Sequence, residues 1–187
     1  EELIKLESMA ASSDELPIIM VGHNRRFSPH LEQLHRWLLL RKNPLVIQYR
    51  VNSGFVPSNH WVHSEGEGRS RIVGEMTHFI DLLNSITGSS ISRVHAERIG
   101  GDNQSAVNND NIAVTFKFKE GSVANLTYAA SGDKAYSREK IEIFFEGNTV
   151  VSEDFRISKK HFGGKAETFK THGQEMGYHE ELKHFIL

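Results

Sequence analysis

Residues 112–128 read IAVTFKFKEGSVANLTY, and this stretch decides the fold class. Large apolar side chains occupy every second position from 112 to 118, and Ala124, Leu126 and Tyr128 continue this alternation after the turn. Such alternation predicts two strands, each with one buried face. The segment Lys119–Ser122 between them contains a glycine and is a hairpin signal. Because so short a connection permits only antiparallel pairing, the sequence predicts an antiparallel sheet.

Further strands are predicted on either side of this hairpin. Residues 45–51 alternate cleanly, and residues 94–99 are weakly patterned. Residues 141–145 and 151–155 alternate around a turn at Glu146–Asn148, which predicts a second hairpin. The run Ile18–Val21 is apolar throughout, a pattern that is typical of a buried parallel strand.

Helical spacing of apolar residues covers about residues 3–12, 29–41, 74–87 and 178–186. Ser28 is expected to cap the second of these helices, with Pro29 at its first position. Gly88 is expected to end the third helix. One face of the sheet is apolar and the other is mixed, so the helices at 29–41 and 74–87 are expected to cover a single face. The predicted fold class is α+β, an open antiparallel sheet with helices packed on one face.

The composition of the chain excludes several classes of protein. The net charge is -2, which gives no electrostatic case for a nucleic-acid or anionic membrane partner. No apolar run approaches the roughly 20 residues of a membrane span. The sequence has no cysteine, so disulfides, thiolate zinc sites and cysteine nucleophiles are excluded. We expect a soluble, cytoplasmic protein, and the helical patterns at both ends predict a fragment of a longer polypeptide.

The predicted helix at 74–87 carries a row of ionisable residues, with Glu75, His78 and Asp81 at intervals of three. Side chains three apart are neighbours on a helix, so the row can act together. Imidazole, which titrates near neutral pH, suits the transfer of a proton. The alternative is a polar helix face on which His78 is a capping or packing residue.

Three motifs, in order along the chain, resemble one known family. Val21–Pro29 (VGHNRRFSP) resembles the GFNRRFSP junction of the glucose–fructose oxidoreductase, inositol dehydrogenase and rhizopine-catabolism (Gfo/Idh/MocA) family. Asn59–His63 (NHWVH) followed by Arg71–Asp81 (RIVGEMTHFID) resembles the HW and GGGRIIGE…HFID block of one branch. Gly177–Leu182 (GYHEEL) resembles the KGH..EL..F helix near the C-terminus of that family.

The resemblance implies an NAD(P)-dependent oxidoreductase of two domains that acts on a sugar, sugar nucleotide or cyclitol such as inositol. Residues 1–27 would end the N-terminal Rossmann domain, and residues 28–187 would form the C-terminal substrate-binding and oligomerisation domain. NAD or NADP would be bound mainly by the missing N-terminal domain, because neither a G-x-G-x-x-G loop nor the family's Glu-Lys-Pro lysine occurs here. The expected partners are a carbohydrate or polyol and further copies of the chain, joined through the sheet face.

This sequence departs from the family pattern in two places. Many members place an acid four residues before the histidine, but that position is Gly74 here and the nearest carboxylate is Glu75, as in the branch that the chain resembles. The glycine triplet of the branch becomes Gly68–Ser70, which keeps one glycine and is therefore less permissive for the backbone.

The resemblance also assigns roles to single residues. His78 would be the catalytic acid–base, assisted by Glu75, and Asp81 would have a structural role, either orienting His78 or capping a neighbouring loop. Asn24, Arg25 and Arg26 follow the predicted strand 18–21, where ligands bind in open α/β sheets. Asn24 and Arg26 are therefore candidates for binding substrate, and Arg25 and Arg26 are candidates for binding cofactor. Either arginine would otherwise form a surface or interdomain ion pair.

The loop at 53–70 supplies two further candidates for substrate binding, His60 and Trp61. A Trp ring stacks well on a sugar and its N–H is a polar handle, although Trp61 would serve equally to anchor the loop to the core. His60 and His63 with His78 also permit a zinc site, since three imidazoles can bind zinc with one position open. Their spacing is loose, so we expect no metal.

Two alternatives to the dehydrogenase stay open at this point. The first is a glycoside hydrolase of the same fold that uses NAD transiently, and it would produce no net change in NADH. The second is a non-catalytic assembly module, which the chain would be if it acted by itself without the dinucleotide domain.

Overall fold

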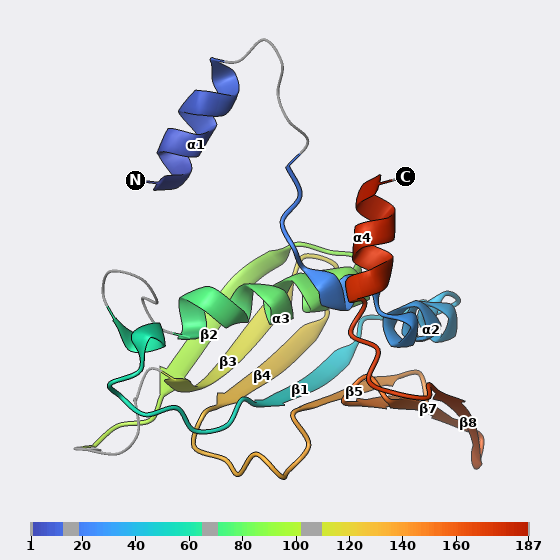
Figure 1. The fold of residues 1–187 in the computed structure, drawn as a ribbon. Helices are drawn as coiled ribbons and strands as arrows, with labels where there is room; N and C mark the ends of the chain where they lie inside the picture. Colours follow the sequence, from blue (N-terminus) through green and yellow to red (C-terminus); the bar gives the residue numbers. More distant parts are fainter. Residues whose placement is uncertain (1, 13–18, 65–70, 102–109, 187) are drawn as a thin grey trace.

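The computed structural model describes residues 2–12, 19–64, 71–101 and 110–186. It contains one large curved sheet with helices lying across one of its faces (Figure 1). The elements in chain order are α1 (Glu2–Ala11), the 3-10 helix η1 (Asn24–Phe27), α2 (Pro29–Leu38), β1 (Val46–Asn52), the 3-10 helix η2 (Trp61–His63), α3 (Arg71–Thr87), β2 (Ile91–Arg98), β3 (Asn111–Phe118), β4 (Val123–Ala129), β5 (Glu139–Phe145), β6 (Asn148–Glu153), β7 (Ile157–Phe162), β8 (Lys165–Lys170) and α4 (Tyr178–Ile186).

The sheet has the strand order β2-β3-β4-β1-β5-β6-β7-β8. All neighbouring strands pair antiparallel except β1 and β4, which run parallel. The α+β class and the mostly antiparallel sheet are confirmed. The parallel pair was not predicted, because β1 and β4 are joined by a long crossover through α3, β2 and β3, not by a turn that the sequence marks.

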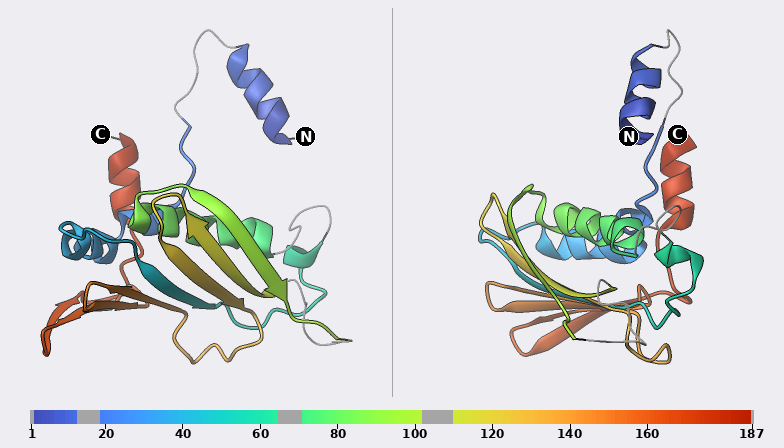
Figure 2. Two further views of the ribbon diagram at one scale, coloured as in Figure 1. Left: turned by 180° about the vertical axis from the view of Figure 1, so that it is seen from behind. Right: turned by 90° about the vertical axis from the view of Figure 1, so that its left-hand side faces the viewer.

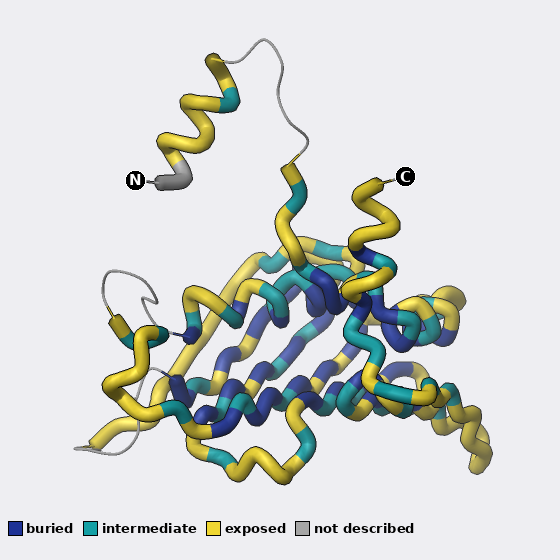
Figure 3. The backbone as a smooth tube through the Cα atoms, in the orientation of Figure 1, coloured by how far each residue is buried: buried dark blue, intermediate teal, exposed yellow. Residues whose placement is uncertain are grey.

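The core lies between the sheet and the two helices α2 and α3. Along β1 the exposed and buried residues alternate, with Ile47 and Val51 fully buried. Leu34 of α2 and Phe79 of α3 meet this face and are at most 1% exposed. Figure 3 shows the buried positions along the strands beneath α3. The prediction that α2 and α3 cover one face of the sheet is therefore confirmed.

The helix ends follow from local chemistry. The Ser28 hydroxyl accepts a hydrogen bond from the backbone N–H of His30, so Ser28 caps α2 as predicted. Gly88 follows α3 with φ 66°, a left-handed conformation that ends helices. α3 begins at Arg71, one turn earlier than predicted, because the Arg71 side chain joins this turn to Glu75 and to the carbonyl of Gly54.

The predicted strand at 18–21 is wrong for the residues that the structure describes. Residues 19–21 form no strand, and Ile19 and Val21 are exposed, at 70% and 69%. Ile18 lies outside the described residues, as do Gly68 and the rest of 65–70 in the predicted loop. An apolar run becomes a buried parallel strand only between neighbouring strands, and no strand of the described chain lies beside this one.

The second hairpin was predicted with one error of register. In β6 the buried residues are Val150 and Ser152, so the face that includes Val151 is not the inner one. Phe155 is buried, but it lies in a turn with φ 50° and not in the strand. The hairpin of β7 and β8 was not predicted strand by strand, because most of its residues are exposed at the sheet edge and carry no apolar alternation.

The helices at the two ends of the chain, α1 and α4, were both predicted and are both present. Figure 2 shows α1 standing apart from the sheet, with α4 rising from the same side of the molecule. No helix of the described chain has the length and apolar character that crossing a membrane requires.

Candidate active site beneath helix α3

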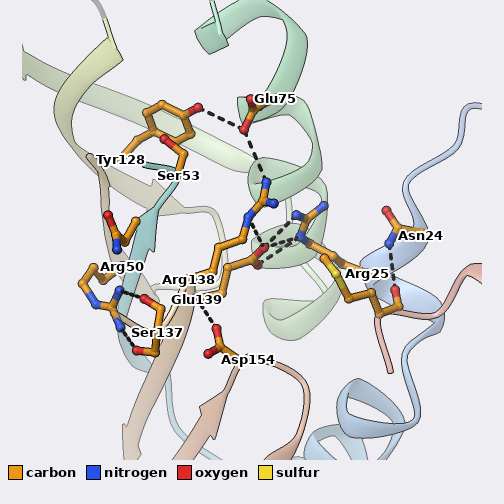
Figure 4. Close-up of polar contacts among 12 residues, drawn as sticks. Asn24, Arg25, Arg50, Ser53, Glu75, Tyr128, Ser137, Arg138, Glu139 and Asp154 are labelled. Carbon is orange, nitrogen blue, oxygen red and sulfur yellow. Dashed lines mark hydrogen bonds and ion pairs between the residues drawn. The ribbon is translucent and has the colours of Figure 1, made fainter. Parts of the chain in front are cut away.

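A buried ion pair lies at the centre of the site. Arg25 of η1 donates to both carboxylate oxygens of Glu139, the first residue of β5, over 2.7 to 3.2 Å. The Tyr49 hydroxyl of β1 donates to the same carboxylate. Figure 4 shows the Arg25 and Glu139 side chains pointing toward one another between the strands and α3. Three elements that are distant in sequence are thus joined through a single carboxylate.

The contacts of Arg25 keep it charged although it is only 5% exposed. Burial alone would lower its pKa, but the hydrogen bond and the charge of Glu139 outweigh burial and raise the pKa. The guanidinium also lies over the Phe79 ring of α3, 4.8 Å from its centroid. Arg25 is therefore a fixed positive charge directly beneath α3.

Glu75 lies in the first turns of α3, and both of its carboxylate oxygens are engaged. Arg71 donates to Oε1 over 3.0 Å, and the Tyr128 hydroxyl donates to Oε2 over 3.0 Å. The Arg138 guanidinium lies 3.7 Å from Glu75 and 3.8 Å from Glu139, so it connects the two carboxylates (Figure 4). The result is a row of alternating charges along the underside of α3.

His78 lies almost one helical turn after Glu75 and is half-buried. Its Nδ1 is buried and has no hydrogen-bond partner among the described residues. Burial, the Arg25 charge and His23 lower the pKa of His78, against the opposing charges of Glu139 and Glu75. A lowered pKa favours the neutral imidazole, which can accept a proton.

Asp81 does not reach His78 directly. It accepts from Arg26 Nε over 2.8 Å, and its Oδ1 lies 3.3 Å from His23 Nδ1. The His23 ring in turn lies edge-on to His78, with the ring centroids 5.4 Å apart. The support of His78 by Asp81 stays a prediction, with His23 lying between the two residues, and the ion pair that was the alternative for Arg26 is present.

Asn24 is 1% exposed, and its amide donates to the backbone carbonyl of Met176 over 2.8 Å. The next residue, Gly177, has φ 87° and approaches the η1 backbone so closely that a Cβ would lie 2.3 Å from the Asn24 carbonyl oxygen. This contact joins two of the sequence motifs, Val21–Pro29 and Gly177–Leu182. Substrate binding by Asn24 stays a prediction, and its observed contact is structural.

The loop residues His60 and Trp61 lie at η2, and no contact of the described chain joins them to His78. His60 Nδ1 accepts from the Val62 backbone N–H, and the Trp61 ring is 61% exposed. The His63 side chain is 8% exposed, and its Nδ1 lies 3.6 Å from Asp110. No group of three or more His, Asp or Glu side chains in the described residues is arranged to hold a metal ion.

A groove lies beside the His78 site, at the junction of η1, α2 and α4. It encloses about 460 Å³, and Arg26 is the residue that both lines it and contacts Asp81. The other lining residues are Phe27, Ser28, Glu32, His35, Glu180, Lys183 and His184. His78 does not line this groove, so we place the chemistry at the charged row beneath α3 and not here.

Several solved structures with this arrangement of strands and helices are dehydrogenases. UDP-N-acetylglucosamine 3-dehydrogenase GnnA from Acidithiobacillus ferrooxidans superposes with a TM-score of 0.72 at 20% identity, over 99% of this chain and 56% of its own. Levoglucosan dehydrogenase in complex with NADH and levoglucosan gives 0.66 at 17%, over 88% and 50%. The chain has the fold of the C-terminal domain of Gfo/Idh/MocA-type oxidoreductases.

The chain spans about half the length of the solved structures that it matches. The same fold occurs in the super-repressor mutant of Gal80p from Saccharomyces cerevisiae, with a TM-score of 0.71 at 16% identity, over 94% of this chain and 52% of that one. No protein-family model and no curated protein matches the chain.

Several residues of the candidate site were not predicted from the sequence, namely His23, Tyr49, Tyr128, Arg138 and Glu139. The tyrosines lie on the apolar faces of β1 and β4, where they count as core residues. Glu139 offered one signal, since it is a charge at the first position of a strand whose alternation would bury it. Its partner Arg25 lies 114 residues away, and no local pattern joins them.

Proposed function

We propose that the chain is the substrate-binding and oligomerisation domain of an NAD(P)-dependent oxidoreductase that acts on a hydroxyl of a sugar, sugar nucleotide or cyclitol. Residues 1–27 would end the dinucleotide-binding domain, and residues 28–187 would form the substrate domain. The fold supports this proposal, because solved structures that share it include dehydrogenases of a sugar nucleotide and of levoglucosan. A cytoplasmic location stays a prediction.

The observation that carries the proposal is the setting of His78 on α3, where its Nδ1 is buried and its pKa is lowered. Oxidation of a secondary alcohol requires that the hydroxyl proton leave as hydride leaves the carbon. A neutral imidazole can take that proton, and Glu75 and Glu139 lie near enough to stabilise the imidazolium that forms. In the reverse direction the imidazolium returns the proton to the alkoxide.

Glu75 has a supporting role in this proposal. Its carboxylate is held by Arg71 and Tyr128, so it adds a fixed negative charge near His78. That charge works against burial, which keeps the pKa of His78 from falling further. Arg26 from η1 and His60 with Trp61 from the loop stay proposed contacts of the substrate.

The residues of this chain do not by themselves fit a dinucleotide. Its pyrophosphate requires a glycine-rich turn before a helix, and no G-x-G-x-x-G occurs in the sequence. Both arginines that were expected to bind it are engaged, Arg25 by Glu139 and Arg26 by Asp81. We propose that NAD or NADP, which would supply the hydride acceptor, is held mainly by residues outside this chain.

The experiment is turnover of the full-length protein that carries this chain. Sugars, sugar nucleotides and cyclitols are supplied with NAD+ or NADP+, and reduced cofactor is followed by absorbance. His78→Ala is expected to lower turnover by about 100-fold or more, because general acid–base catalysis contributes that much. His95→Ala, at an exposed position of β2, is the matched control. Undiminished turnover in His78→Ala would refute the acid–base role.

The open face of the sheet is the proposed surface for self-association. Val46 of β1 and Phe144 of β5 are 50% and 41% exposed on it, and a hollow of about 400 Å³ is lined by Arg50, Tyr136 and others. The mass of the particle in solution at high protein concentration tests whether the chain self-associates.

A non-catalytic assembly module is the second candidate, and the shared fold of the Gal80p super-repressor favours it. A full-length protein that binds NAD(P) and a sugar but never reduces the cofactor would support this candidate. Cleavage of a glycoside with no net reduction would instead indicate the hydrolase.

A further inference from the structure

His23 is the residue at which this chain departs from the motif that its η1 segment otherwise resembles. The motif GFNRRFSP has phenylalanine where this sequence has His23. A phenylalanine there would only pack, whereas an imidazole can also carry a proton and form ion pairs. The residue directly precedes η1, so its backbone is fixed by the same turn that buries Arg25.

The His23 ring lies between carboxylates from two helices. Asp81 of α3 lies 3.3 Å from Nδ1 and is itself held by Arg26. Glu181 of α4 is 7% exposed, and its Oε1 is buried without a hydrogen-bond partner. Burial raises the pKa of Glu181, the charge of His23 opposes this and the charge of Asp81 adds to it. His23 is thus the basic group shared by α3 and α4.

The other side of the ring meets His78. The two ring planes are inclined by 74° with centroids 5.4 Å apart, an edge-to-face contact. His78 also faces Arg25 from η1, Glu75 on its own helix and Glu139 from β5. Among these groups His23 is the one in ring contact with His78, so it fixes both the orientation and the charge environment of that imidazole.

We propose that His23 is a positioning residue of the acid–base site, held by Asp81 so that its ring orients His78 and keeps His78 neutral before substrate binds. This rests on the proposed function of His78. The charge of His23 lowers the pKa of His78, because a positive charge beside an imidazole disfavours a proton on it. A lowered pKa leaves His78 free to take the proton of a substrate hydroxyl.

The test is an NMR titration that measures the pKa of His78 in the 187-residue chain, with the histidines isotopically labelled. The His78 signals are the ones that disappear from the spectrum of the His78→Gln variant. His23→Phe restores the ring of the motif without the charge. We expect the midpoint of His78 to rise by about half a pH unit, the effect of one unit charge at this distance in a high dielectric. His95→Phe, the same change at an exposed strand position, should leave the midpoint in place.

A second variant, His23→Asn, keeps a hydrogen-bond donor for Asp81 and serves if His23→Phe does not fold. A rise in either folded variant supports the proposal, and an unmoved midpoint overturns it. The titration does not depend on turnover. An unmoved midpoint in a protein that loses activity on His78→Ala rejects only the role of His23. A raised midpoint with unaffected turnover in His78→Ala rejects the proposed function.

Discussion

A buried histidine outside the candidate site should make the stability of this domain fall as the solution becomes mildly acidic. His30 of α2 is fully buried, with Nδ1 2.8 Å from the Ser158 hydroxyl and Nε2 2.9 Å from the Thr171 hydroxyl. Both ring nitrogens are thus satisfied by neutral groups, and the Phe169 ring packs against the imidazole edge-on. Burial lowers the pKa of His30 to about 4.

The sign and size of the effect follow from linkage between protonation and folding. The unfolded chain binds a proton at His30 below about pH 6.5, whereas the folded chain does not until about pH 4. Stability is therefore lost as the pH falls through this window. The loss is about 2 kcal/mol between pH 7 and pH 5, and about 3.4 kcal/mol once both states are protonated, at about 1.36 kcal/mol per unit.

The assay is urea denaturation at pH 7 and pH 5, followed by tryptophan fluorescence and extrapolated to water. His30→Gln removes the titrating group. Between pH 7 and pH 5 the free energy of unfolding of this variant should therefore fall by about 2 kcal/mol less than that of the original chain. His95→Gln, at an exposed site, should behave like the original chain. Equal losses in His30→Gln and the original chain would refute the reasoning, because other groups titrate alike in both.

Two further predictions concern packing and assembly. Gly177→Ala should destabilise the fold by about 2–4 kcal/mol, because the new Cβ meets η1 backbone atoms and the left-handed φ costs energy. Gly147→Ala has a similar φ of 73° with open space around it, so it should lose only about 1–2 kcal/mol, and equal losses in urea would contradict the close approach. Sheet-face association predicts a particle heavier than 21.2 kDa in sedimentation at high concentration, and a monodisperse monomer would speak against it.

The parts of the fold that were predicted depend on signals within about 20 residues. The hairpin at 112–128 carries its alternation and its turn together, and Ser28–Pro29 marks the start of α2 locally. The parallel pairing of β1 with β4 carries no such signal, because it depends on which strands compete for the edges of β1. The exposed hairpin of β7 and β8 lacks apolar alternation, so only its partner β6 fixes it.

The candidate site also has one part that the local sequence predicts and one part that it does not. The Glu75, His78 and Asp81 row lies on one helix, so its spacing alone places the three residues on adjacent turns. That spacing does not predict which residues each of the three side chains contacts. Asp81 pairs with His23 and Arg26 across to η1, and Glu75 is held by Tyr128 of β4. These partners are brought together by the sheet order, which is a property of the whole chain.

The position of β1 in the sheet has a consequence for the order of folding. β1 is synthesised before both of its neighbours, since Val46 pairs with Val123 of β4 on one side and with Phe144 of β5 on the other. β1 therefore has no partner strand until β4 has been made, and it lacks its second neighbour until β5 has been made; contacts of such long sequence separation slow folding. Arg25 waits equally long for Glu139. A nascent chain released before this point would expose an apolar strand and an unpaired charge together.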